Sequence, residues 1–343
     1  MVFHTTQTGT PLSYTSGQML PQPRHSTPAS RWIGFTIAAL AAMLMSPTTQ
    51  AQRRTAPTVP DIEGVWDTGT ATPLTRPAPF ATKSHFTREE AEAFERDNYA
   101  RILSVFSAED RLASDLNDTY QETAGLKVVS DLRTSLIVDP PNGQLPDQLP
   151  AAKVRADARP KRNYDDPETL TLDERCLMGV NYSSSAATPP LVPNPFGQNL
   201  YQIVQTANRI VIHSELIHEA RVIRINGTHL PPFMRTWTGD SIGHWEGDTL
   251  VVDTTNFRND THYRNSGERL HVVERFTRVS PTELRYRVTV EDPDTWAAPW
   301  TAEIPFRATT KQIFEYACHE GSLTIENILR GARDEERRGV RPR

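Results

Sequence analysis

Several features that identify common classes of protein are missing from this sequence. It has only two cysteines in 343 residues and no compact Cys-x-x-Cys or His-x-x-x-His spacing, the usual signature of a zinc site. It has no phosphate-binding loop and no dinucleotide-binding fingerprint, which argues against nucleotide chemistry. The net charge of −5, from 37 Lys and Arg against 42 Asp and Glu, argues against a strongly cationic nucleic-acid binder.

The residues that are present fit a folded, turn-rich chain. Hydrophobic residues make up 37% and charged residues 23%, which supplies a core and excludes a wholly disordered or fibrous protein. The 27 prolines indicate many turns and argue against a long helical bundle. The length is compatible with one large domain or two small ones.

The N-terminal stretch predicts an export signal. Residues 1–51 contain no Asp or Glu, and Arg31 stands just before an apolar run at residues 33–45. Thr49 and Ala51 then place small residues at −3 and −1 of a cut after Ala51. The run is shorter than the ~20 apolar residues of a confident membrane span, and an uncleaved anchor is the alternative. We therefore expect a periplasmic or secreted protein with no membrane attachment after signal removal.

Export changes the interpretation of Cys176 and Cys318. In an oxidising compartment an even pair of cysteines favours a disulfide. Closing so long a loop stabilises a fold by about 4–5 kcal/mol in the chain-entropy model. Two unrelated buried thiols are the alternative. A catalytic cysteine is disfavoured, because an exported thiol is easily oxidised.

One long helix, many strands and one short C-terminal helix are predicted along the rest of the chain. Thr87 followed by Glu90 forms a capping box, and the apolar stripe that follows predicts an amphipathic helix at 87–104. Residues 144–199, rich in Pro, Asp and Ser, are predicted to be irregular. The predicted strands are 61–66, 133–139, 201–205, 210–217, 221–225, 244–245, 249–255, 270–279, 284–292, 300–307 and 313–318, with a short helix near 324–329.

Successive hairpins without intervening helices predict a mainly β fold. Because a meander removes its edges by closing on itself, we expect an antiparallel barrel, with a β-sandwich as the alternative. One N-terminal amphipathic helix and long Pro-rich loops complete the expected architecture. The expected division is a signal peptide at 1–51, a linker at 52–60, one β-rich domain at 61–331 and a charged, frayed tail at 332–343.

Two sets of motifs resemble known proteins. The opening Ile62-x-Gly64-x-Trp66 resembles the first strand of lipocalin-like barrels. The runs at 133–143, 174–176, 239–254 and 315–321, which include GDSIGHWEGDTLVVDT and EYACHEG, resemble signatures of a family of uncharacterised secreted bacterial proteins. This family resemblance covers roughly residues 61–332. It implies export and one shared fold, but no particular activity.

Histidines and carboxylates of the strand-rich half are the candidate catalytic groups. We predict that Glu215, His229, His319 and Glu320 converge on one pocket as an acid–base set. His319 and Glu320 follow the cysteine of the expected disulfide, which would hold them rigid. A histidine fixed beside a carboxylate is oriented for proton transfer and has a raised pKa. The alternative is that each is a solvated or half-buried, hydrogen-bonded strand residue.

Aromatic side chains are the candidate lining of that pocket. Trp237, Trp245 and Tyr286 are predicted to bind substrate together with His213, because small-molecule pockets combine aromatic walls with a few polar groups. Packing in the core and in turns is the alternative. Asp253 is interpreted as structural.

Other chemistries have weaker support. Ser241, in Gly239-Asp240-Ser241-Ile242-Gly243, is interpreted as a turn residue rather than a nucleophile. No cofactor is expected, and a zinc ion bound through His213, Glu215 and His229 is the less favoured alternative.

The function predicted on these grounds is an exported protein with a small-molecule pocket. The first hypothesis is an acid–base enzyme that performs hydrolysis, elimination or isomerisation on an apolar or aromatic small molecule. The alternative is a non-catalytic periplasmic binding protein for an apolar ligand. An enzyme would place a His–carboxylate pair at the bottom of its pocket, whereas a binder would keep its charges at the rim. A nucleic-acid partner is not expected, and the sequence carries no signal for the oligomeric state.

Overall fold

The computed structural model describes residues 59–104, 125–159, 165–172, 174–178, 186–194, 197, 199–259, 263–321 and 323–340. The predicted signal peptide and most of the predicted linker lie outside these ranges. Within them, no helix is long and apolar enough to cross a membrane.

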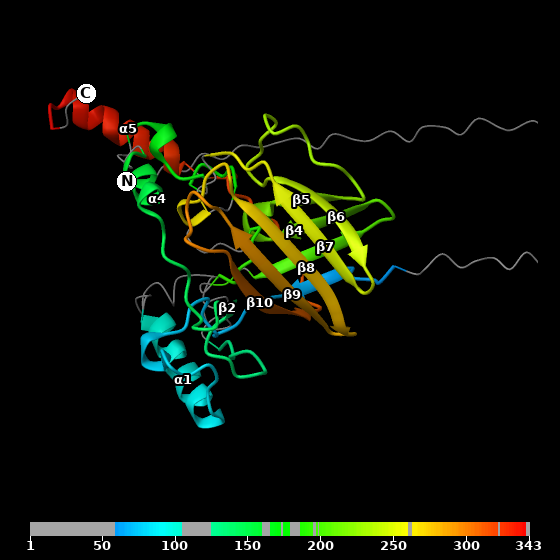
Figure 1. The fold of residues 1–343 in the computed structure, drawn as a ribbon. Helices are drawn as coiled ribbons and strands as arrows, with labels where there is room; N and C mark the ends of the chain where they lie inside the picture. The colour runs from blue at the N-terminus through cyan, green and yellow to red at the C-terminus, as the bar shows by residue number, and fades with distance from the viewer. Residues whose placement is uncertain are drawn as a thin grey trace, which may run out of the picture. The chain divides into compact units, whose positions relative to one another are not determined.

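A closed β-barrel forms the centre of the fold (Figure 1). Nine strands run in the order β1-β3-β4-β5-β6-β7-β8-β9-β10, and pairing of β1 with both β3 and β10 closes the circuit. A tenth strand, β2, also pairs with β10. The strands are β1 (Gly64–Asp67), β2 (Ile137–Asp139), β3 (Leu200–Gln205), β4 (Arg209–Ser214), β5 (Ala220–Ile225), β6 (Asp240–Glu246), β7 (Thr249–Thr255), β8 (His271–Ser280), β9 (Glu283–Glu291) and β10 (Trp300–Ala308). The predicted barrel is confirmed, and the sandwich alternative is excluded.

Among the described residues, three α-helices accompany the barrel: α1 (Arg88–Ser104), α4 (Pro150–Asp157) and α5 (Thr324–Arg337). The capping box that predicted α1 is formed, because the Thr87 N–H donates to Glu90 at 2.7 Å and the Glu90 N–H donates to the Thr87 hydroxyl at 3.2 Å. Helix α4 lies in the stretch predicted to be irregular. Helix α5 continues to Arg337, so it enters the stretch predicted to be a frayed tail.

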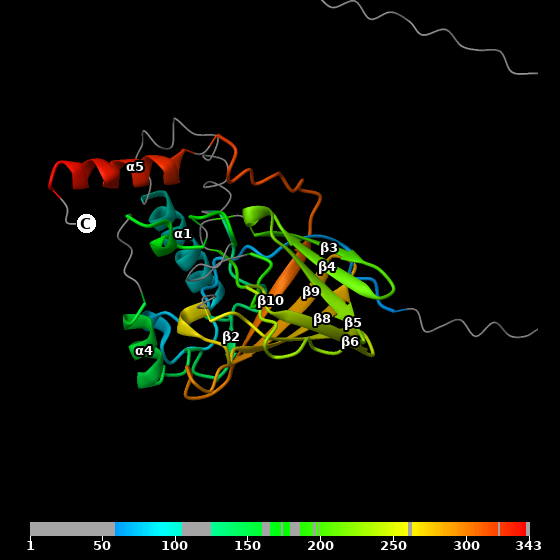
Figure 2. The ribbon, with the colours of Figure 1, turned by 90° about the horizontal axis from the view of Figure 1, so that it is seen from above.

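One strand pair departs from the predicted meander. Every neighbouring pair in the barrel is antiparallel except β5 and β6, which are parallel. Asn226 adopts a positive φ of 53°, as the predicted turn requires, but residues 226–239 then carry the chain back along the barrel instead of making a hairpin. A parallel pair needs a connection of about a dozen residues, which this loop supplies. Figure 2, turned by 90° from Figure 1, shows the paired strands β3 and β4 side by side.

The loop enters β6 through a position that only glycine fits. Gly239 has a φ of 73°, and a Cβ built there would lie 2.7 Å from Cγ2 of Thr254 and 2.8 Å from the ring of Phe257. A larger residue would have to displace the core residue Phe257, which is fully buried. This close approach fixes where β6 begins.

The barrel encloses one large core. In β9, Leu284, Tyr286 and Val288 are buried, whereas Arg285 and Arg287 are exposed, as the alternation of residue types predicts. Trp66, Trp300 and Phe306 are among the largest fully buried side chains of this core.

Two other predicted elements need correction. The stretch 313–318 was expected to be a strand, but it forms none, and its chain is held instead by the disulfide and by contacts to the end of β4. The strand predicted at 210–217 ends at Ser214, because Leu216–His218 form a short 3-10 helix. The predicted disulfide between Cys176 and Cys318 is confirmed, with Cα atoms 5.8 Å apart.

Candidate functional site

The interior of the barrel is filled by side chains. Arg221 and Glu274 form a two-point ion pair at 2.5 and 2.9 Å, with both side chains almost completely buried. The Tyr286 hydroxyl donates to Glu274 at 2.9 Å and accepts from the Leu191 N–H at 3.0 Å. Burial, followed by the Glu274 charge, raises the pKa of Tyr286 well above its ordinary value. These groups complete the core.

A chain of alternating charges lies on the outer face of β6–β9. His229, from the loop between β5 and β6, contacts Asp240 through Nδ1 and Asp253 through Nε2, each at 3.0 Å. The second oxygen of Asp253 lies 3.1 Å from Nε2 of His271. Nδ1 of His271 lies 2.7 Å from Glu291. We call these five residues the outer lattice.

Both ring nitrogens of His229 and both ring nitrogens of His271 therefore face carboxylates. The hydrogen bond to Asp253, reinforced by Glu291, raises the pKa of His271 to about 9 against the opposing effect of burial. The same hydrogen bond lowers the pKa of Asp253. A general base needs an unprotonated nitrogen that faces its substrate, so the outer lattice is not arranged for acid–base catalysis.

A second group of ionisable side chains lies where β4 ends. It consists of His213, Glu215 and His218, which we call the β4-end group. Burial raises the pKa of Glu215, whose carboxylate accepts from the Phe314 N–H at 3.2 Å. Burial also lowers the pKa of His213, helped by the nearby His218. Burial is the main cause of both shifts, so Glu215 and His213 are partly desolvated ionisable neighbours.

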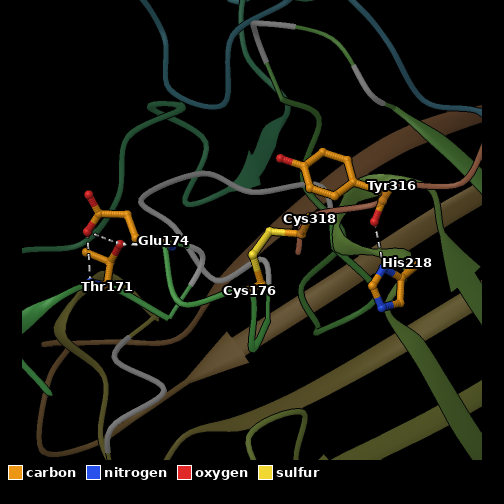
Figure 3. The surroundings of a disulfide bond; sticks show 6 residues. All are labelled: Thr171, Glu174, Cys176, His218, Tyr316 and Cys318. Atoms are coloured by element: carbon orange, nitrogen blue, oxygen red, sulfur yellow. Dashed lines mark hydrogen bonds between the residues drawn. A yellow bond between two sulfur atoms is a disulfide. The ribbon is translucent and has the colours of Figure 1, made fainter. Parts of the chain in front are cut away.

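The backbone and hydrogen bonding of His218 set it apart. Its Nδ1 lies 2.9 Å from the Tyr316 carbonyl, and because a carbonyl only accepts, Nδ1 is the donor (Figure 3). Ile217 and His218 have positive φ values of 56° and 43°. Such conformations are strained in non-glycine residues and gather at functional sites. The β4-end group is thus the better acid–base candidate of the two.

The disulfide borders a hollow of about 490 Å³ next to this group. Cys176, Cys318 and Tyr316 line it, and Figure 3 shows the disulfide and the Tyr316 carbonyl that holds His218. Glu174 and Glu315 add carboxylates, and Ile325 and Ile328 of α5 add apolar surface. We call this the disulfide hollow.

A larger pocket, of about 610 Å³, lies between α1 and residues 70–80. Its lining is mainly apolar and includes four prolines. Phe80 and Phe94 meet edge to face there, with ring centroids 6.2 Å apart. The charged groups of α1 that line it are half-buried or exposed: Glu90, Asp97 and Arg101. We call this the α1 pocket.

The four predicted catalytic residues are not brought together. Glu215 belongs to the β4-end group and His229 to the outer lattice. His319 and Glu320 are exposed, just after Cys318. Among the described residues no hydrogen bond or ion pair joins His229 to the other three, and none of the four lines either hollow. The reason is topological: the long loop between β5 and β6 docks His229 on the outer face of the barrel.

The predicted substrate-binding residues also lie apart. Tyr286 is sealed in the core, so it is not open to a ligand. Trp245 packs against that core, and Trp237 is covered by the Arg258 guanidinium at 5.3 Å from its ring. His213 stays beside Glu215. None of the four lines the α1 pocket or the disulfide hollow.

Ser241 was interpreted as a turn residue, but it lies in β6. Its surrounding pentapeptide has the letters of the Gly-x-Ser-x-Gly nucleophile motif. That motif places serine on an exposed strand-to-helix turn. Here the hydroxyl is buried and bonded to Thr254 at 2.9 Å, so it is not an accessible nucleophile.

Sequence reasoning did not single out three residues of the outer lattice, Asp240, His271 and Glu291, and it interpreted the fourth, Asp253, as structural. A signal for two of them exists in the turn at 246–248. Counting back from this turn pairs Ile242 with Asp253, and Asp240 shares the face of Ile242. Within the described part of the chain, no group of three or more His, Cys, Asp or Glu is arranged to hold a metal ion.

No protein-family model matches the chain, and no curated protein is significantly similar to it. A crystal structure of a point mutant of the fluorescent protein UnaG aligns with 33% of this chain and 72% of the UnaG chain, at 12% sequence identity and a TM-score of 0.21. A likeness this low carries no argument. The function is therefore argued from the side chains.

Proposed function

We propose that this chain is an exported β-barrel protein that binds an apolar, ring-containing small molecule in the α1 pocket. The observation that carries the proposal is the pocket itself. Its volume of about 610 Å³ lies within the ~300–1,000 Å³ typical of small-molecule sites. Phe80, Phe94 and the four prolines offer flat, rigid surfaces to a ring system.

The charges of the α1 pocket favour binding over catalysis. Glu90 is neutralised by Lys83, whose Nζ lies 2.6 Å from it. Asp97 and Arg101 are exposed and stand one helical turn apart on α1. No histidine lines this pocket. Charges at the rim and apolar walls inside are the arrangement expected of a binder.

The packed barrel directs the ligand to the periphery. Arg221, Glu274 and Tyr286 occupy the interior and bond to one another, so a ligand there would have to displace a buried ion pair. The α1 pocket needs no such displacement. The Cys176–Cys318 disulfide supports the exported location, since such bonds persist in oxidising compartments.

Binding of the neutral fluorescent probe N-phenyl-1-naphthylamine tests this proposal. We expect the probe to bind the wild-type chain with a blue-shifted, enhanced emission. Ala93→Trp places an indole in the pocket and should weaken binding at least about tenfold, because it fills the space the probe needs. Ala100→Trp is the matched control, since Ala100 is exposed on the same helix and does not line the pocket.

Equal binding by wild type and Ala93→Trp would refute the proposal, as would an equal loss in both tryptophan variants. Thermal unfolding of each variant separates a filled pocket from a damaged fold. If Ala93→Trp is unfolded, Phe94→Ala gives a second test, because it removes an aromatic wall without adding bulk.

A second candidate function is acid–base catalysis at the β4-end group. It is favoured by the partly buried Glu215, whose pKa is raised by burial, and by the positive φ of His218, whose Nδ1 is held by the Tyr316 carbonyl. Turnover of 4-nitrophenyl acetate by wild type, Glu215→Gln and His218→Gln tests it, with His244→Gln as the control. A rate that equals the buffer rate, or that neither variant lowers, would remove this candidate.

A further inference from the structure

Three arginines gather on the outer face of the hairpin formed by β8 and β9. Arg275, Arg285 and Arg287 have side chains that are 41%, 55% and 48% exposed. They point outward because alternate residues of each strand face the core. We call them the arginine face. The cluster stands out in a chain whose net charge is −5.

Two of these arginines are placed against each other. Arg275 and Arg287 are direct cross-strand partners. Like charges in this position lie about 5 Å apart at Cβ and destabilise a sheet. Nothing in the fold of the hairpin demands a charge at both positions, because both side chains leave the core. Glu246 pairs with Arg275, whereas Arg287 has only a 3.7 Å contact to the shared Glu303, so an anion bound beside Arg287 would offset the less compensated charge of the two.

The carboxylates nearby do not balance this charge. Glu303 is shared among Arg133 at 3.2 Å, Arg287 at 3.7 Å and Arg285 at 3.9 Å. The two longer contacts are ion pairs without a hydrogen bond. Among the described residues, neither Arg285 nor Arg287 donates a hydrogen bond from its guanidinium, so their donors face solvent. Arg275 is paired with Glu246.

The shape of the face limits what binds it. Neither the α1 pocket nor the disulfide hollow includes these arginines, so a ligand lies along the strands. Arg285 and Arg287 are two residues apart, which places them about 7 Å apart along β9. Thr277 and Thr289 flank them with hydroxyl groups. A ligand with repeated anionic groups and hydroxyls at similar spacing fits this pattern.

We propose that the arginine face binds an anionic polysaccharide through its carboxylate or sulfate groups. A guanidinium fork matches the planar oxygens of such groups and pairs with two of them at once. A single-stranded nucleic acid is disfavoured, because the arginine face carries no aromatic side chain on which bases stack. A bilayer is disfavoured, because the face offers no large apolar side chain for insertion. This inference is independent of the α1 pocket.

Binding to soluble polyanions tests the inference on the full exported chain. The probes are polygalacturonate for carboxylates and dextran sulfate for sulfates, with neutral dextran as the blank, at about 0.15 M salt. Wild type should bind at least one polyanion, and the Arg285→Gln/Arg287→Gln double variant should bind it about tenfold more weakly. Arg209→Gln/Arg269→Gln is the matched control, because it removes the same charge at two exposed positions elsewhere.

Each other outcome contradicts the inference. No binding to either polysaccharide overturns it, and so does an equal loss in the control variant, which would indicate a net-charge effect. Tighter binding to double-stranded DNA or to anionic phosphatidylglycerol vesicles would assign the face to another partner. The Arg287→Gln variant alone gives a readout that needs no ligand: its thermal unfolding midpoint should not fall, because the substitution relieves the opposed pair.

Discussion

The barrel has ion pairs on both sides of its wall, and the two sets behave differently. Inside, Arg221 and Glu274 meet at two points and Tyr286 completes the contact, with no access to water. Outside, the carboxylate of Asp253 is shared by two histidines, and its side chain is 38% exposed. Desolvation makes the inner pair sensitive to the loss of either partner, whereas solvent screens the outer lattice.

The comparison also explains why neither set is a good catalyst. The inner groups are sealed, so no substrate reaches them. The outer histidines are accessible, but each uses both ring nitrogens on carboxylates. Acid and base groups on a barrel therefore do not by themselves make an active site. What decides is whether an ionisable group keeps an atom that a substrate can reach, and the exposed His218 comes nearest to this condition.

The largest expected effect comes from breaking the inner pair. Glu274→Ala leaves Arg221 buried without a counter-ion and should lower the free energy of unfolding by about 3–5 kcal/mol. Urea unfolding followed by tryptophan fluorescence measures this. The double variant Arg221→Met/Glu274→Met should recover most of the loss, because no unpaired charge remains. A loss below about 1 kcal/mol for Glu274→Ala would mean that water reaches the interior.

The second-largest effect is expected from removing the Cys176–Cys318 disulfide, which should leave both sets of ion pairs in place. Cys176→Ser/Cys318→Ser frees the chain after β10 from the loop at 171–178 and should cost about 2–4 kcal/mol. Protease cleavage confined to residues 309–340, with unchanged near-ultraviolet circular dichroism, is the expected accompaniment. Loss of that signal would show that the tether also supports the barrel core.

A smaller effect is expected from the outer lattice. Asp253→Asn removes the carboxylate that two histidines share and should lower the free energy of unfolding by about 1–2 kcal/mol, less than the inner variant because solvent screens the site. Asp248→Asn, at an exposed turn of the same hairpin, is the control. A loss of stability as large as that of Glu274→Ala would contradict the proposal that the outer lattice contributes less than the buried ion pair.

The smallest effect is a pH dependence. The pKa of His271 is raised from an ordinary 6.5 to about 9. Because the raised value belongs to the folded state, the stabilisation is complete below about pH 6.5 and is lost as the pH rises through about 9. After solvent screening we expect about 1 kcal/mol, measured as the change in urea midpoint between pH 6 and pH 10. This pH-dependent change in urea midpoint should be smaller in His271→Gln. An equal change in that variant would assign the pH dependence to another group.

Local sequence patterns predicted most strands of the barrel. They did not predict the contacts between residues far apart in the sequence. The capping box at Thr87 and the alternation in β9 involve neighbours in the sequence, so they are visible without a structure. The parallel pairing of β5 with β6 depends on where a long loop docks, and no turn motif encodes that. The family resemblance and the export signal stay predictions.

The candidate site was harder to predict for the same reason. The α1 pocket is assembled from residues 70–80, α1, Leu136 and Val192, which are scattered along the chain. His229 was identified as a functional candidate. Its partners Asp240 and Asp253 lie in the motif at 239–254, but their contact with His229 depends on strand register and on where the loop docks. Counting the hairpin from the turn at 246–248 would have indicated that the two aspartates share a face.

Barrel closure through β1 has a consequence for how the chain folds. In β1, Trp66 pairs with Tyr201 of β3 on one side and with Ala308 of β10 on the other. The first strand of the sequence therefore completes its pairing only after the last strand is in place. Such non-local pairings form slowly. Until they form, β3 and β10 present unpaired edges that another copy can join. The yield of refolded monomer should therefore fall as protein concentration rises, even though the closed barrel has no open edge in its circuit of strands.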